Sequence, residues 1–408
     1  MLELFAIFIT VSSVLGFINH KWLKFPTTIG VMFISVIMGV ILKIIEAFEP
    51  SYVEPITEFL RNFDFSTFVL DFILCFLLFA GSLHVDISQL KGARATVFSY
   101  ATLGVIISTV LIGLAFNFIV HLFGYEINPI IGFLFGALIS PTDPIAVLGI
   151  LSKYKIPQKL KTEIIGESLF NDGVGVVVFA VIFSILKGGD ESYTVSHIAK
   201  IFATEVFGGV GIGLLIGYLG YLMMKNIDHY QTEIMITLSV VTGGYALASH
   251  LHASGPLAMV VAGLLIGSKG KKHAMSDITA EYVDKFWELI DEICNTILFI
   301  LMGLEIFLVA FSSSYILIGV LLIVVTLAAR YISLLPAFFI FNRKEKDRNL
   351  NLAVLTWGGL RGGISIALAL SLTNKVEGSN LVIVCTYCIV LFSILVQGLS
   401  IKKLLSKY

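Results

Sequence analysis

The sequence contains few charged residues. Asp, Glu, Lys and Arg make up 13% of its 408 residues, whereas 57% are hydrophobic; soluble domains usually carry about a quarter charged residues. The net charge is −1 and there are no long charge runs, so nucleic acid is not an expected partner. The composition predicts an all-α integral membrane protein that crosses the bilayer many times.

Cysteine is also scarce, and its placement argues against a disulfide framework. The four cysteines all lie within apolar runs, and the pair Cys385 and Cys388 lacks a second pair or a nearby histidine to complete a metal site. The N-terminal "MLELFAIFITVSSVLGFINHK" lacks a basic leader and a small-residue cleavage site. We therefore expect buried thiols and an uncleaved first helix rather than a signal peptide.

Long apolar runs dominate what remains, and charged or turn-rich interruptions divide them. A membrane span needs roughly 17 to 25 mainly apolar residues. This criterion predicts thirteen helices, at approximately 4–19, 25–42, 65–85, 95–120, 127–150, 162–186, 206–224, 233–249, 253–268, 293–311, 314–341, 352–374 and 379–401.

The basic residues indicate an orientation. Loops after the odd-numbered helices hold 20 of the 27 Lys and Arg residues, and loops on the other side hold five. The other two, Arg330 and Arg361, lie within predicted helices. By the positive-inside rule, the N-terminus faces outward and the C-terminus faces the cytoplasm.

Two of the predicted spans contain helix-breaking residues. The fifth includes "LISPTDPIAVL", in which Pro141 and Pro144 flank Asp143, and the twelfth includes "TWGGLRGGISIAL", in which four glycines surround Arg361. The predicted helices divide the chain into two six-helix halves, residues 1–186 and 233–401. A linking helix and loops at 187–232 join them, and a short tail at 402–408 follows. Each helix with breaker residues is then the fifth helix of its half. Two six-helix units separated by one extra span have opposite orientations. The pattern predicts an inverted repeat whose two interrupted helices cross at the midplane, beside a transport site.

Four charged residues in these spans need partners. Asp143, Glu167, Asp172 and Arg361 together would cost on the order of 10 kcal/mol if they were unpaired in the membrane. Glu167 and Asn171 stand four residues apart on one helix face. We therefore expect Glu167 to pair with Arg361, whose guanidinium suits a bidentate carboxylate, with Asn171 held beside that pair.

The neighbouring helix face carries a second pair, Ser168 and Asp172, which we expect to face an ion path. Burial favours the protonated form of a carboxylate and a bound cation favours the ionised form, so a proton and a cation compete for Asp172. Hard oxygen ligands favour Na⁺ or a similar cation. The opened backbone at Thr142 offers a carbonyl, and Asp143 offers a second carboxylate. Gly173 and Gly175 allow other segments to approach closely.

Other polar residues in or near the spans have weaker assignments. Asp86 either guides ions to the site or contacts them, or is a plain helix-end charge. Asp71 is expected to have a partly hydrated structural role. For Glu305 and Arg330 we expect a structural ion pair, with each other or with the backbone. His84, His250 and His252 are either pH sensors or simple interfacial residues.

Four motifs, taken in order, resemble those of a known family. They are "SPTDPIAVL", "GESLFNDGVGVVVF", "HASGPLA" at 252–258 and "WGGLRGGISIALAL" at 357–370. Together they resemble the monovalent cation:proton antiporter family one, most closely its NhaP-type sodium/proton antiporters, with landmarks shared by the eukaryotic sodium/hydrogen exchangers. The resemblance covers essentially the whole chain.

The resemblance implies a division of the polar residues into two groups. Ion and proton binding falls to Asp172, Ser168, Asp143, the main chain of Thr142 and Asp86, with Na⁺ at Asp172, Ser168, Asp143 and Thr142. The stabilising ion-pair cluster comprises Glu167, Asn171 and Arg361.

The resemblance also implies how the protein works. It implies a homodimer and alternating access, in which a core domain of helices 4–6 and 11–13 moves against a dimerisation domain. The asparagine before Asp172 is similar to the electroneutral branch, which implies one Na⁺ (or Li⁺) per H⁺. The resemblance implies a role in pH homeostasis. It implies neither a cofactor nor an enzymatic activity. The short tail lacks the regulatory domain of the eukaryotic exchangers, which favours a prokaryotic inner membrane.

Three alternatives remain open at this point. The same scaffold could exchange K⁺ for H⁺, because ligand type does not set fine size selectivity. An intramembrane aspartyl protease would use Asp143 and Asp172 as a dyad, but the prolines around Asp143 and the polar neighbours of Asp172 argue against it. A passive channel is disfavoured because a helix crossover leaves no continuous pore.

Overall fold

The protein is helical throughout the part that the structure describes. The computed structural model describes residues 2–85, 87–143, 154, 156–188, 195–342 and 347–407. The first helices are α1 (Leu2–Ile18), α2 (Thr27–Phe48), α3 (Glu54–Asn62), α4 (Phe65–Thr67), α5 (Leu74–Leu83), α6 (Ile87–Ser99), α7 (Val105–Leu122), α8 (Pro129–Ile139), α10 (Gln158–Lys187) and α11 (Val195–Met224). They are followed by α12 (Tyr230–His250), α13 (Gly255–Leu265), α14 (Lys271–His273), α15 (Asp277–Glu305), α16 (Ser313–Phe341), α17 (Arg348–Trp357), α18 (Gly363–Leu370), α19 (Ser379–Phe392) and α20 (Leu399–Leu405).

Short turns of other helical types continue or join several of these helices. One is a 3₁₀ turn, η2 (Pro50–Tyr52), and the others are π-helical: η1 (Asn19–Leu23), η3 (Phe68–Ile73), η4 (Tyr100–Gly104), η6 (Ile266–Gly270) and η7 (Ser393–Gly398).

At the start of α4, the Asp64 carboxylate accepts a hydrogen bond from the backbone N–H of Thr67 at 3.0 Å. Hydrogen bonds from the side chain and backbone of Thr67 hold the pKa of Asp64 below its usual value.

The predicted membrane segments correspond to helices. Within the described residues, eight helices are long and apolar enough to cross a membrane. The other five predicted segments also overlap helices, but these are shorter, interrupted or more polar. A many-helix membrane fold is thus confirmed, whereas the count of thirteen spans and the inverted repeat stay predictions.

The α15 helix differs most from its predicted range. The sequence predicts a span at 293–311, but the helix runs from Asp277 to Glu305 and so begins far earlier. The stretch "DKFWELIDE" was excluded from the span because of its charges, yet it is helical because one face packs inward. Trp287 is fully buried, and its indole N–H donates to Thr237 Oγ1 at 2.9 Å.

In both predicted spans with breaker residues, the helix stops at those residues, as predicted. Helix α8 begins at Pro129 and ends at Ile139, two residues before Pro141, because a proline cannot continue the helical hydrogen bonds. Helix α17 ends at Trp357, and α18 begins only at Gly363. Between the halves, the Asp143 N–H donates to the Leu360 carbonyl at 2.8 Å in an isolated antiparallel bridge. The two interrupted segments therefore lie against each other, as the sequence indicates.

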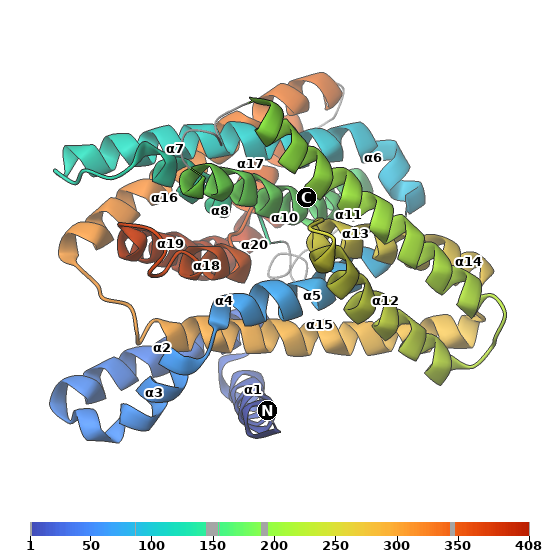
Figure 1. The fold of residues 1–408 in the computed structure, drawn as a ribbon, viewed down its shortest axis with the longest axis horizontal. Helices are drawn as coiled ribbons and strands as arrows, with labels where there is room; N and C mark the ends of the chain where they lie inside the picture. Colours follow the sequence, from blue (N-terminus) through green and yellow to red (C-terminus); the bar gives the residue numbers. More distant parts are fainter. Residues whose placement is uncertain are drawn as a thin grey trace.

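The helices pack in two neighbouring groups. In one group α7 packs against α8 and α16, α19 against α16 and α18, and α10 against α8; in the other, α15 packs against α2 and α5, and α13 against α5 and α11. Figure 1 shows α15 extended along one side of the molecule with α1, α2 and α3 beyond it, and α7, α8 and α16 on the opposite side. Contacts of α10 with α13, and of α18 with α15, join the groups. The interrupted segments lie near this boundary.

Candidate functional site

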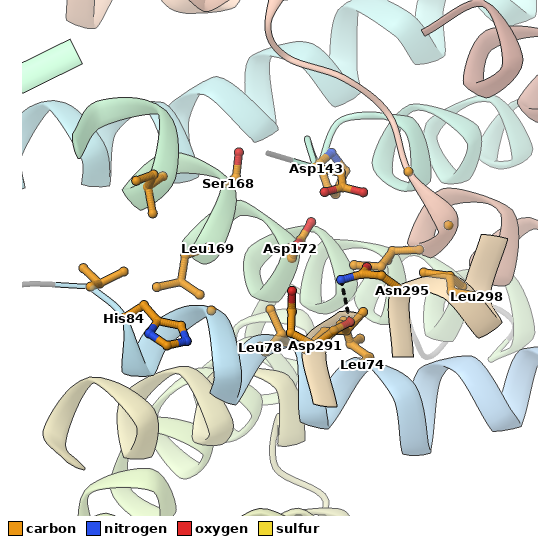
Figure 2. Close-up of a pocket in the computed structure, with 18 of the residues that line it drawn as sticks. Leu74, Leu78, His84, Asp143, Ser168, Leu169, Asp172, Asp291, Asn295 and Leu298 are labelled. Carbon is orange, nitrogen blue, oxygen red and sulfur yellow. Dashed lines mark hydrogen bonds between the residues drawn. The ribbon is translucent and has the colours of Figure 1, made fainter. Parts of the chain in front are cut away.

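A cavity of ≈ 440 Å³ lies between the two groups, beside the interrupted segments. Its wall includes Asp172 and Ser168 of α10, Asp143 of the first interruption, and Gly362 and Gly363 of the second. Figure 2 shows Ser168 and Asp172 on the same helix, with Asp143 close by. The structure thus brings these three residues to one cavity, and their role in ion binding stays a prediction.

Of the two predicted carboxylates in this wall, Asp172 is more deeply buried than Asp143. Asp172 is 8% exposed and lines the cavity. Glycines follow it directly: a Cβ at Gly175 would overlap the Pro141 ring, and one at Gly173 would lie 2.7 Å from Leu257 Cδ2. The expected close approach of other segments to these glycines is confirmed.

Thr142 joins the extended segment to α10. The Asn171 amide donates to Thr142 Oγ1 at 2.8 Å, and the Thr142 N–H donates to Asn171 Oδ1 at 3.3 Å. The Thr142 hydroxyl also lies 3.2 Å from Ser168 Oγ. Two neighbouring faces of α10 therefore both hold the same short segment. This differs from the prediction that Asn171 lies beside an arginine clamp.

The predicted pairing of Glu167 with Arg361 is wrong. Glu167 is instead held by Arg330 of α16, whose Nη1 donates to Oε1 and whose Nη2 donates to Oε2 at 2.8 Å. Arg330 Nη2 also donates to the Leu355 carbonyl at 3.2 Å. Both side chains are buried, as a charge-assisted bidentate pair in an apolar surrounding requires. Arg330 thus forms a structural ion pair, but with Glu167 rather than with Glu305.

Arg361 instead stabilises the crossing of the interrupted segments. Its Nη1 donates to the carbonyls of Ser140 at 2.7 Å and Pro141 at 2.8 Å, and its backbone N–H donates to Ser393 Oγ at 2.8 Å. The end of α8 leaves carbonyls without helical donors, and its dipole attracts a cation. Arg361 satisfies both needs, which explains why it lies here rather than at Glu167.

Two of the remaining predicted polar residues, Asp71 and Glu305, are not among the residues that line this cavity. Asp71 accepts a hydrogen bond from Tyr245 Oη at 3.1 Å and lines a separate hollow together with His250. Glu305 is buried at the end of α15. Asp86, predicted to reach the ion, lies outside the described residues, as does Pro144.

The cavity also has a wall that the sequence did not predict. It comes from α15, which contributes Glu288, Asp291, Asn295 and Leu298, while His84 lines another part of it. His84 Nδ1 lies 3.4 Å from Asp284 Oδ1, which also pairs with Lys271. Polar residues at spacings of three and four, Glu288, Asp291 and Asn295, are the signal that could have revealed the α15 wall.

The described residues do not offer a ready-made transition-metal site. No group of three or more His, Cys, Asp or Glu residues within the described ranges is arranged to hold such an ion. The cavity instead offers oxygen atoms of carboxylates, hydroxyls and amides. These suit a hard cation that exchanges rather than one that is retained.

Comparisons with known proteins agree with this architecture. Residues 8–407 match the family described as "Sodium/hydrogen exchanger, transmembrane". The chain belongs to this family. It is therefore a multi-pass membrane transporter rather than an enzyme, which removes the protease alternative. Ion exchangers of this family need no cofactor.

Individual relatives match the exchanger over its full length. It is 47% identical to the Na(+)/H(+) antiporter NhaP of Pseudomonas aeruginosa, covering 100% of this chain and 97% of that protein. It is 34% identical to the Na(+)/H(+) antiporter NhaH of Halobacillus dabanensis, over 95% of this chain and 93% of that protein. The solved structure of the sodium proton antiporter MjNhaP1 from Methanocaldococcus jannaschii has the same fold, with a TM-score of 0.75 at 20% sequence identity. The match covers 100% of this chain and 98% of that chain.

Proposed function

We propose that this exchanger moves Na⁺ across the membrane in one direction and H⁺ in the other, by competition of the two ions for Asp172. The observation that carries the proposal is a buried carboxylate, Asp172, that lines a cavity together with Ser168 and Asp143. Burial favours the protonated carboxyl, and a cation restores the ionised form, so one ion loads when the other leaves. The names of the curated relatives support Na⁺ as the cation.

The neighbouring oxygen atoms would complete the cation's coordination. Ser168 Oγ and the Asp143 carboxylate border the same space as Asp172, and the Thr142 carbonyl belongs to the extended segment beside them. Asn171 and Ser168 hold Thr142 in place, so its backbone is oriented before the ion arrives. Such preorganised hard ligands suit Na⁺ and also Li⁺. Asp86 would reach the ion from the region after α5.

Alternating access would occur at the boundary between the two helix groups. In this proposal, α6, α7, α8, α10 and α16–α20 form a core that moves against the remaining helices, which also form the dimer contact. The small residues Gly173 and Gly175 lie where α10 meets α13 and the interrupted segment. The proposed orientation places the C-terminus in the cytoplasm of a prokaryotic cell. Asn171 before Asp172 supports an electroneutral 1:1 exchange.

The decisive experiment is a cation series in proteoliposomes. Purified protein is reconstituted with a trapped pH dye, and Na⁺, Li⁺ or K⁺ is added with and without an imposed membrane potential. We expect Na⁺ and Li⁺, but not K⁺, to change the pH inside the liposomes. The membrane potential should not alter the rates of this pH change. A K⁺ response equal to that of Na⁺ would favour the K⁺/H⁺ alternative, and a potential-dependent rate would contradict 1:1 exchange.

Substitution of Asp172 tests the carrier residue. Asp172→Asn preserves size but cannot exchange a proton for a cation, so we expect Na⁺-driven proton movement to fall to the level of empty liposomes. The matched control is Asp277→Asn, the same change at an exposed carboxylate at the start of α15, which should retain transport. Retained exchange in a folded Asp172→Asn protein would assign the carrier role to another acid.

A further inference from the structure

The α15 wall of the cavity carries a regular polar stripe. Glu288, Asp291 and Asn295 all line the cavity and recur at intervals of three and four residues. Such spacing places side chains on one face of a helix. The stripe lies in a different helix group from Asp172, so the cavity has polar groups on two separate walls.

Asn295 has an unused acceptor in a buried position. Its side chain is 1% exposed, and its Nδ2 donates to the Asp291 carbonyl at 2.9 Å, one turn earlier. Because a carbonyl can only accept, this bond fixes which end of the amide is the oxygen. Oδ1 then has no hydrogen-bond partner among the described residues. An unpartnered buried amide oxygen is destabilising because it has lost its bonds to water without a replacement.

The orientation of these side chains favours a ligand in the cavity. Figure 2 shows Asn295 and Asp291 extending from α15 toward the space in front of Asp172. Amide and carboxylate oxygens are hard donors that suit an alkali cation. Asp291 belongs to α15 and Asp172 to α10, so the two carboxylates line the cavity from different helix groups.

We propose that Asn295 Oδ1 and the Asp291 carboxylate form a second cation position inside the cavity, distinct from the position at Asp172. This position holds a hydrated Na⁺ weakly on the α15 wall, from which it transfers to Asp172 when the proton leaves. Weak binding is required, because a tightly held ion would not move on. The inference rests on the proposed Na⁺ exchange at Asp172, but its binding test does not depend on transport.

The binding test uses thermal stability, because a ligand that binds the folded state raises the melting temperature. Purified Asp172→Asn protein is heated in increasing NaCl and, separately, in choline chloride of equal ionic strength. We expect Na⁺ to stabilise this variant more than choline does, with lower affinity than in wild type. The double variant Asp172→Asn/Asn295→Leu should lose this difference. A complete loss in Asp172→Asn alone would show a single site and overturn the proposal.

The transport test separates binding from turnover. In wild-type background, Asn295→Leu and Asp291→Asn should each raise the KM for Na⁺ by about tenfold, as expected for one lost polar contact, with kcat within about twofold. Asn295→Asp retains an oxygen at this place and should keep a low KM. Unchanged KM in both Asn295→Leu and Asp291→Asn would mean that water alone occupies the position, and a lower kcat at unchanged KM would mean a structural role.

Two control variants match these substitutions elsewhere in the chain. Asn226 is exposed and makes the same type of bond, from Nδ2 to the carbonyl four residues earlier at 2.8 Å. Asn226→Leu and the surface variant Glu281→Gln should leave KM unchanged. If wild-type protein fails to exchange Na⁺ for H⁺, the proposed function fails, while the binding series still decides whether the second position exists.

Discussion

Arg330 and Arg361 have separate tasks although both are buried near the interrupted segments. Arg330 neutralises Glu167, whereas Arg361 donates to the two carbonyls at the end of α8. Removing one partner of a buried ion pair leaves an uncompensated charge, which is more damaging than removing both. The stability of α10 against α16 therefore depends on this particular pairing.

A double-mutant cycle tests the pairing at the residue scale. Arg330→Gln should lower the free energy of unfolding by about 3–5 kcal/mol, since Glu167 stays buried without its partner. Glu167→Gln/Arg330→Gln should recover part of that loss in thermal melts of detergent-solubilised protein. Cycles of Glu167 with Arg361 serve as the control and should show weaker coupling. Stronger coupling to Arg361 would contradict the observed pair.

At the scale of elements, the fit of α10 against the first interrupted segment depends on Gly175. A Cβ at this position would overlap the rigid Pro141 ring, so the two elements could not keep their present separation. Thr142, the next residue, is bonded to Asn171 and Ser168 of the same helix. A shift of α10 would therefore disturb the site as well as the packing.

Gly175→Ala tests this contact. We expect it to destabilise the protein by about 1–3 kcal/mol, as overpacking in a dense interior does, and to reduce Na⁺/H⁺ exchange. The control is Gly243→Ala in α12, where no described atom lies within 4 Å of the added Cβ. That variant should be neutral or stabilised by up to about 1 kcal/mol, because alanine favours helix. Thermal melts and proteoliposome assays measure both effects; equal behaviour of the two variants would show that the Pro141 contact is unimportant.

At the scale of the whole molecule, the cavity reaches from Asp172 to residues at the predicted cytoplasmic ends of the spans. His84 and Lys161, both near basic loops, line it together with Asp172. Under the proposed orientation, the structure is open toward the cytoplasm. Gly81 faces this cavity, and the only described atom near an added Cβ is Leu169 Cδ1 at 3.8 Å.

Cysteine labelling tests this orientation. In a cysteine-free background, Gly81→Cys should react with a membrane-impermeant thiol reagent in inside-out vesicles and be protected in right-side-out vesicles. The exposed Glu126, in a predicted outer loop, provides the opposite control as Glu126→Cys. Labelling of Gly81→Cys only from the outside would contradict the proposed opening.

The sequence by itself determined the helical membrane fold, the two interruptions and the shared location of Asp143, Ser168 and Asp172. These follow from local causes: apolar length, proline and glycine chemistry, and the i, i+4 geometry of one helix. The sequence-based pairing of Glu167 with Arg361 is wrong because a guanidinium in a helix carries no local signal of its distant acceptor.

Only the tertiary structure decided the partners of groups far apart in the chain. It placed α16, rather than the second interruption, against Glu167, and it brought Asp291 and Asn295 of α15 to the cavity. Two of the charges that make the start of α15 unlike a membrane helix, Glu288 and Asp291, line this wall. The physical reason is that a buried polar side chain takes the nearest partner that packing provides, and packing depends on the whole chain.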